Sequence, residues 1–184
     1  MYAKIQSIYG FSDYQIAQLR FTFRTFISEI SKLIILAIVF RNNLPLFVWA
    51  AVILRLTRAS TGGIHCNSYI SCLLFSYVFL ALTINVLPSI SLNIILELCI
   101  LSLCMAISFF IGPVISTKHL ALTDKTRLKL KFKLSLTIFL YMIFLFIMPE
   151  NPYSITGFWV IVLNTLQHIF SKLQKGASNE KENL

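Results

Sequence analysis

The apolar positions in the middle of the chain form two long runs with a short break between them. Residues 69–87 are almost entirely apolar up to Pro88, and residues 90–111 form a second run that is closed by Gly112. At about 1.5 Å of rise per residue, each run is long enough for a helix to cross about 30 Å of hydrocarbon. The short break predicts an antiparallel helical hairpin over residues 69–111.

A second pair of apolar runs follows further along the chain. Residues 134–148 are apolar up to a turn that contains Pro149 and Pro152, and residues 153–170 follow at once. Both runs are shorter than the first two, and they are marginal as membrane spans unless they extend into their flanks. The proline-containing turn predicts a second helical hairpin over residues 134–170.

Basic residues between the two hairpins indicate the orientation in the membrane. The segment 112–133 contains a single acidic residue, Asp124. Its basic residues are Lys118, Lys125, Arg127, Lys129, Lys131 and Lys133. Because short loops rich in Lys and Arg stay in the cytoplasm, we expect 112–133 to be a basic cytoplasmic loop. The segment 58–68, which precedes the first hairpin, is then expected on the same side.

Residues 31–57 allow two interpretations. Apolar runs at 33–40 and 44–54 are interrupted by Arg41 and two asparagines. A single broken helix would put Arg41 inside the membrane, at a cost of at least about 2.5 kcal/mol. Two shorter helices that turn at 41–45 return the chain to the cytoplasmic side, as basic residues on both flanks require. We therefore favour two helices.

Composition agrees with a membrane protein. The 184 residues are 57% hydrophobic and 12% charged, and the mean hydropathy is +0.79. A soluble domain of this length could not bury so much apolar surface. We expect an all-α polytopic membrane protein, a single domain over 1–184 with about six membrane helices, two of them short. Residues 1–30 are expected to form an amphipathic cytoplasmic or interfacial segment, and residues 171–184 a polar tail.

Candidate chemistry lies in and just after the segment 58–68. His65 and Cys72 bring an imidazole and a thiol to the start of an apolar helix. Gly62 and Gly63 give the preceding loop conformational freedom, since glycine adopts positive φ without steric cost. These are the parts of a cysteine nucleophile with its base.

The distance between His65 and Cys72 depends on where the helix begins. On one straight helix the two residues would lie about 10.5 Å apart along the axis. Asn67 and Ser68 are both good N-cap residues, and a helix that starts there has Cys72 about one turn in. His65 would then lie on a loop that can fold back. The helix N-terminus and an imidazolium both favour the thiolate, which is the nucleophilic form.

Other assignments of this chemistry are weaker. Cys66 is a rival nucleophile, but its position next to His65 makes a contact with the same imidazole strained. Cys99 and Cys104 lie in an apolar run, where cysteine usually packs as a small hydrophobe. The sequence has no HExxH motif and no zinc-type spacing of His and Cys, so we expect no metal site and no cofactor. The simpler alternative is that His65 is an interfacial polar group and Cys72 a packing residue.

The motif that combines these residues is Arg58-x3-Gly62-Gly63-x-His65-x6-Cys72. In a small basic membrane protein, it resembles the accessory gene regulator protein B (AgrB) family of Gram-positive bacteria. The resemblance implies a cysteine endopeptidase of the cell membrane, with His65 as base and Cys72 as nucleophile at the cytoplasmic face. It also implies that Arg58 and Gly63 are needed for full activity, with Gly62 as a further supporting position.

The same resemblance implies a substrate. The family removes the C-terminal tail of an AgrD-like propeptide through an acyl-enzyme thioester and promotes cyclisation to a thiolactone or lactone signal peptide. The basic loop resembles the family's own, although its lysines alternate with other residues. Weak candidates for propeptide contacts are Lys125, Arg127, Lys129, Lys131 and Lys133. The resemblance further implies a homodimer in contact with membrane lipid.

The net charge of +9 suits an acidic partner at the membrane surface, although topology alone could also account for it. No nucleic-acid partner is expected. The alternative function is a non-enzymatic small membrane transporter or accessory subunit, in which Arg41 and Glu97 would be pathway or partner residues. The sequence shows no internal repeat and few polar groups inside its apolar runs, which favours the enzyme.

Overall fold

A computed structural model describes residues 12–61, 68–90, 92–113 and 123–182. Within these ranges the chain forms α-helices joined by short turns, and no strand is present. The α-helices are α2 (Asp13–Val39), α3 (Leu44–Thr61), α4 (Tyr69–Ala81), α5 (Ile94–Ile111), α6 (Asp124–Ile147) and α7 (Pro152–Glu182). The shorter elements are the 3-10 turns η1 (Arg41–Asn43) and η3 (Leu87–Ser89) and the π-helical turn η2 (Leu82–Val86). The all-α prediction is confirmed.

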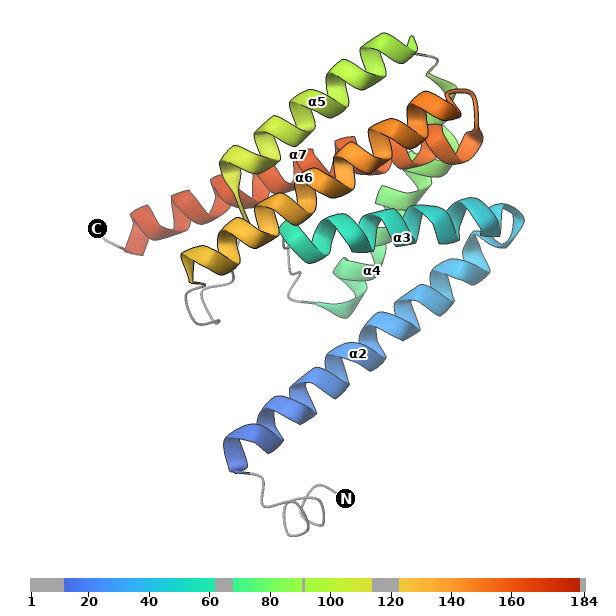
Figure 1. Ribbon diagram of the computed structural model, residues 1–184. Helices are drawn as coiled ribbons and strands as arrows, with labels where there is room; N and C mark the ends of the chain where they lie inside the picture. Colours follow the sequence, from blue (N-terminus) through green and yellow to red (C-terminus); the bar gives the residue numbers. More distant parts are fainter. Residues whose placement is uncertain (1–11, 62–67, 91, 114–122, 183–184) are drawn as a thin grey trace. The chain divides into compact units, whose positions relative to one another are not determined.

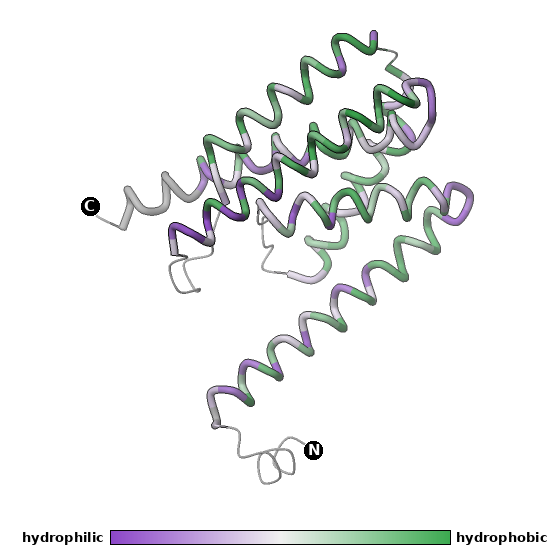
Figure 2. Tube along the Cα trace, in the orientation of Figure 1, coloured by the Kyte–Doolittle hydropathy of each residue, from purple (hydrophilic) through white to green (hydrophobic). Residues whose placement is uncertain are grey.

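Four helical segments are long and apolar enough to cross a membrane. They are Arg41–Thr61, Tyr69–Ser89, Ile94–Ile111 and Asp124–Ile147. Figure 2 shows the apolar positions along α5 and along the second half of α6. The protein is therefore an integral, multi-pass membrane protein, as predicted. The expected spans near 33–40 and 153–170 lie on α2 and α7, which are not among these four segments.

Helix α2 forms a unit of its own, which ends at Arg41. A capping box starts it: the Gln15 amide N–H donates to Ser12 Oγ (3.3 Å), and the Ser12 N–H donates to Gln15 Oε1 (2.9 Å). Helix α2 continues through residue 30, where we had expected the interfacial segment to end. The first of the two short helices expected within residues 31–57 is therefore part of a longer helix. The chain then breaks at η1, the position of the turn in the two-helix interpretation.

The second unit, residues 42–184, is a helical bundle in which α3, α5, α6 and α7 pack side by side (Figure 1). Its core contains large side chains that are almost completely buried. These include Leu101, Ile138, Leu145, Phe158 and Ile161. Because α3, α5 and α7 run in one direction and α6 in the other, the end of α5, the start of α6 and the second half of α7 lie at the same end of the bundle.

Helix α4 passes across α3 (Figure 1) and is irregular at its end. Asn85 in η2 accepts a side-chain hydrogen bond (3.2 Å) from Asn43, which immediately precedes α3. The irregularity has a local cause, because Pro88 has no N–H and its ring collides with the carbonyl of residue 84 in a regular helix. A π-helical turn relieves that collision. Helix α4 begins at Tyr69, eight positions after α3 ends at Thr61.

Two segments are more helical than expected. The segment 123–133 belongs to α6, not to a loop, because it is rich in Lys, Leu and Arg and contains neither Gly nor Pro. Asp124 in its first turn also complements the helix dipole. The polar segment that we had expected as a tail from residue 171 continues α7 as far as Glu182.

Candidate active site

Cys72 lies in the first turn of α4. Ser68 is the N-cap with an extended backbone, and the Cys72 N–H donates to the Ser68 carbonyl (3.1 Å). The hydroxyl of Ser68 makes no capping hydrogen bond. The Cys72 side chain is half-buried. The thiol therefore lies at the N-terminal end of α4.

Several predicted residues lie outside the described part of the chain. They are Gly62, Gly63 and His65, together with the rival nucleophile Cys66 and the N-cap candidate Asn67. Of the two N-cap candidates, Ser68 is the one at which α4 begins. The contact between His65 and Cys72 stays a prediction.

Arg58 is held in the last turn of α3 by two neighbours. Its Nη2 donates to Oε1 of Gln167 on α7 (2.8 Å), and its guanidinium carbon lies 5.7 Å from the ring centroid of Phe79 on α4. A charged hydrogen bond and a cation–π contact together fix both the position and the plane of the guanidinium. Arg58 therefore links the end of α3 to α7 and to the last turn of α4.

Gln167 is a residue that sequence reasoning missed. It is 9% exposed and lies 109 positions from its partner Arg58. The signal that could have found it is a row of polar residues at helical spacing within and directly after the apolar run 153–170. Buried members of this row on α7 include Ser154, Asn164, Gln167, His168 and Ser171. Such a row indicates that this face packs on protein, since polar groups facing lipid would be costly.

The basic residues of α6 occupy two different faces of the helix. Lys125, Lys129 and Lys133 are four residues apart and lie on one face, whereas Arg127 and Lys131 lie on another. All but Lys131 are exposed, and Figure 2 shows the hydrophilic positions over the first half of α6. The basic residues that alternate with other residues in the sequence are therefore divided between two faces of α6.

Lys131 differs from the other basic residues because it packs against α5. Its Nζ lies 5.3 Å from the ring centroid of Phe109, and its side chain passes close to Gly112. Gly112 has a φ of +69°, a conformation that favours glycine and ends α5. His168 Nε2 lies 2.9 Å from the Gly112 carbonyl oxygen, so α5, α6 and α7 meet at this glycine.

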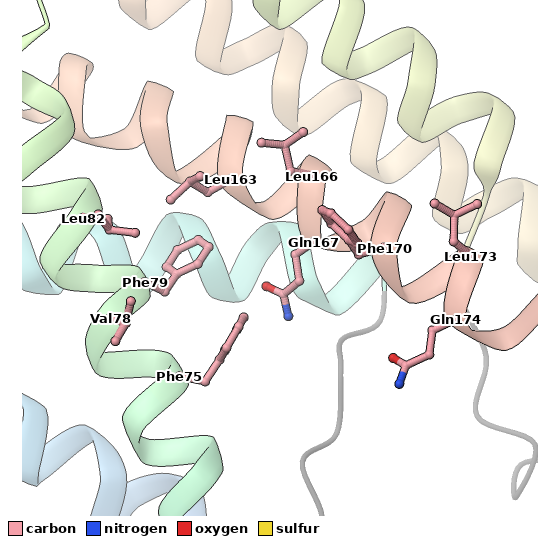
Figure 3. Close-up of a pocket in the computed structure, with 10 residues that line it drawn as sticks. All are labelled: Phe75, Val78, Phe79, Leu82, Leu163, Leu166, Gln167, Phe170, Leu173 and Gln174. Carbon is pink, nitrogen blue, oxygen red and sulfur yellow. The ribbon is translucent and has the colours of Figure 1, made fainter. Parts of the chain in front are cut away.

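A groove of about 790 Å³ lies between α4 and α7 (Figure 3). Its apolar lining consists of Phe75, Val78, Phe79, Leu82, Leu163, Leu166, Phe170 and Leu173. Among the described residues, the polar side chains in the lining are those of Gln167 and Gln174. We refer to it as the α4–α7 groove. It shares Phe79 and Gln167 with the contacts that hold Arg58.

The bundle thus defines a class, that of multi-pass membrane proteins with a half-buried thiol at a helix start, an anchored arginine nearby and a basic helix at the same end. The family model described as Accessory gene regulator B matches residues 2–171. The chain belongs to the AgrB family.

A curated relative agrees with this assignment. The chain is 32% identical over 123 residues to a protein of Clostridium beijerinckii described as "Putative AgrB-like protein". The match covers 64% of this chain and 60% of the relative's own length. No solved structure matches the chain.

Proposed function

We propose that the protein is a membrane-embedded cysteine endopeptidase that removes the C-terminal tail of an AgrD-like quorum-sensing propeptide. The observation that supports this most is the position of Cys72 in the first turn of α4, in a chain of the AgrB family. Phe79, which contacts Arg58, follows Cys72 by seven residues on the same helix.

In the first step, the Cys72 thiolate attacks the carbonyl carbon of the peptide bond. His65 then gives a proton to the nitrogen of the leaving amine, and the bond between that nitrogen and the carbonyl carbon breaks. The C-terminal fragment leaves, and the N-terminal part of the propeptide stays attached to Cys72 as a thioester.

In the second step, a thiol or hydroxyl of the bound peptide attacks the thioester carbonyl. The attacking group passes its proton to His65, the bond to Cys72 breaks, the Cys72 thiolate is regenerated, and a thiolactone or lactone ring closes. Exchange between two thioesters is nearly isoenergetic, so excluding water conserves the energy of the acyl bond. Because the attacking group belongs to the same peptide, its effective concentration is high.

The basic residues of α6 suit an acidic part of the propeptide. Lys125, Lys129 and Lys133 are exposed on one face, and their charges attract an acidic segment at the membrane surface. The positive charge also favours a cytoplasmic location for this end of the bundle. In this proposal the enzyme acts at the cytoplasmic face of a Gram-positive cell membrane, in contact with lipid and as a homodimer.

Co-expression with an epitope-tagged AgrD-like propeptide tests the proposal. We expect Cys72→Ala and His65→Ala to abolish cleavage while both variants still insert into the membrane. Cys66→Ala is the matched control, and it should process the propeptide normally. Full processing by Cys72→Ala would sink the assignment, and loss of processing in Cys66→Ala alone would move the nucleophile to that residue.

The same experiment addresses the non-enzymatic alternative. Arg41 and Glu97 are the residues that a transporter or accessory subunit would use, and Glu97 is 5% exposed on α5. Under that alternative, the wild-type protein does not cleave the tagged propeptide. Glu97→Gln then changes the transport or accessory activity of the protein, and Cys72→Ala does not.

A further inference from the structure

We propose that the α4–α7 groove binds the apolar peptide segment that directly precedes the scissile bond. This inference rests on the proposed function, because it assigns a subsite next to Cys72. The occupant is the part of the substrate that remains bonded to Cys72 after the tail has left.

The position of the groove along α4 carries the first part of the argument. Phe75 and Phe79 follow Cys72 by three and seven residues, so all three lie on neighbouring parts of one helix face. The lining begins one turn beyond Cys72, at Phe75, and ends at Leu82. Leu82 is ten residues from Cys72, which is about 15 Å along the helix axis. An extended peptide at about 3.3 Å per residue would cover the distance from Cys72 to Leu82 with four or five residues.

The size and lining of the groove fit such an occupant. A volume of about 790 Å³ lies in the upper part of the range of roughly 300–1,000 Å³ that is usual for ligand sites. Apart from two glutamines, the lining is apolar. Figure 3 shows Phe75, Val78 and Phe79 on one side and Leu163, Leu166 and Phe170 on the other. Side chains that enter this space meet an apolar surface.

Gln167 indicates that the occupant is a peptide. Its Oε1 accepts the hydrogen bond from Arg58, and arginine can only donate, so the amide nitrogen points away from that contact. This nitrogen is buried in the groove lining and has no hydrogen-bond partner among the residues that the structure describes. A buried donor without an acceptor is costly. A backbone carbonyl of a bound peptide would satisfy it, whereas a lipid acyl chain offers no acceptor.

The chemistry of the proposed reaction indicates which part of the substrate, before or after the scissile bond, occupies the groove. The segment after the scissile bond departs in the first step. The segment before it must stay in place until the ring closes, and water must be kept from the thioester in the meantime. An apolar groove that begins one turn from Cys72 serves both needs, so it determines which residues are accepted before the cleavage site.

Alkylation by peptide chloromethyl ketones tests this inference without the natural propeptide. The Cys72 thiolate displaces chloride, so a C–S bond forms, a C–Cl bond breaks, and the peptide residues occupy the side that precedes the scissile bond. The full-length protein in phospholipid nanodiscs is treated with one of three chloromethyl ketones. The first carries acetylated Phe-Leu-Phe, the second carries acetylated Ser-Asn-Ser, and the third carries a tetradecanoyl chain in place of a peptide. Labelling of Cys72 is followed by mass spectrometry and normalised to the reaction with glutathione.

We expect the apolar tripeptide to label Cys72 at least about tenfold faster than the polar tripeptide does, because apolar pockets discriminate between side chains by at least this factor. Val78→Trp fills the groove and should remove that preference. The matched control is Leu74→Trp, on the same helix but outside the lining and 61% exposed, which should change the rate less than about twofold. Circular dichroism and gel filtration verify that both variants fold.

Gln167→Glu is the second, independent variant. It keeps an acceptor for Arg58 and replaces the amide donor by an oxygen. Labelling by the apolar tripeptide should fall about two- to tenfold, the effect of one neutral hydrogen bond. Labelling by the tetradecanoyl ketone should not fall, because that compound has no peptide carbonyl to accept from Gln167.

The remaining outcomes separate the two proposals. If no ketone labels Cys72 faster than glutathione, the activated nucleophile of the proposed function is wrong and the subsite falls with it. If the two tripeptides label Cys72 rapidly and equally, and Val78→Trp has no effect, the nucleophile stands and the groove assignment is overturned. Faster labelling by the tetradecanoyl ketone than by the apolar tripeptide also overturns it, because the groove would then be a lipid site.

Discussion

The two ends of the helical bundle use their polar groups in different ways. At the end where α6 meets α7, the indole N–H of Trp49 donates to the Tyr153 carbonyl (2.9 Å), and the Tyr141 hydroxyl donates to the Ser154 carbonyl (2.5 Å). Gly157 leaves the space that the Tyr141 ring occupies. We call this the Trp49 end. Its hydrogen bonds close the junction of α3, α6 and α7.

The opposite end, which we call the Cys72 end, leaves polar groups available. Gln167 Nε2 and His168 Nδ1 are buried and have no hydrogen-bond partner among the described residues. Arg58 lies at the border of an apolar groove, where it donates to Gln167 and contacts Phe79. Ser154 Oγ at the Trp49 end is also buried without a partner among the described residues, but Gln167 Nε2 differs from it because it lines a groove. In the proposed function, the Trp49 end maintains the fold and the Cys72 end performs the chemistry.

Cys72→Ala should separate the two ends most sharply. The thiol takes part in both proposed steps, so processing of an AgrD-like propeptide should become undetectable. The side chain is only half-buried, so the Tm of the purified protein should stay within about 2 °C of wild type. The measurement pairs a cleavage assay with thermal unfolding in detergent. A large drop in Tm would mean that Cys72 is part of the structural core.

Arg58→Ala should have the next largest effect. It removes a charged hydrogen bond of the kind that contributes about 1.5–3 kcal/mol, together with the contact with Phe79. We expect processing per folded molecule to fall about ten- to a hundredfold, which is the same energy expressed as a rate. Arg58→Lys tests geometry against charge, and it should recover only part of the activity, because a lysine cannot reproduce the planar fork. Full recovery would show that charge alone suffices.

Gly157→Ala should weaken the Trp49 end by about 1–3 kcal/mol without changing processing per folded molecule. The added methyl group would collide with the Tyr141 hydroxyl and ring, which hydrogen bonds hold in place. Unfolding in detergent measures the loss. In the double variant with Tyr141→Phe, the two effects should be less than additive, since the hydroxyl is the nearest atom. Strict additivity would contradict this contact.

Lys131→Met should have the smallest effect, a loss of about 0.5–1 kcal/mol from the cation–π contact with Phe109. Lys129→Met is its matched control, because Lys129 is exposed on the other face of α6 and its loss should not change stability. Binding of an acidic peptide to nanodiscs should show the reverse order, with Lys129 contributing more. Equal effects of the two variants in both assays would mean that the faces of α6 are equivalent.

Much of the architecture is predictable because lipid imposes a simple pattern. Runs such as 69–87 and 90–111 must be helices, since backbone groups in hydrocarbon have no other partner. The position of Cys72 one turn into its helix agrees with the helix start expected at Asn67 or Ser68, although the Ser68 hydroxyl makes no capping hydrogen bond. The helical state of 123–133 was not predicted. Alternating lysines suggested a loop, yet the helix propensity of these residues extends α6.

The sequence by itself determined that this is an all-α membrane protein of the AgrB family, because apolar run length and a local motif are properties of neighbouring residues. The tertiary structure decided the rest of the candidate site. Only packing of α7 against α3 and α4 brings Gln167 to Arg58 across 109 positions and forms the α4–α7 groove beside Cys72. No local pattern encodes such a contact, because it depends on which faces of distant helices meet.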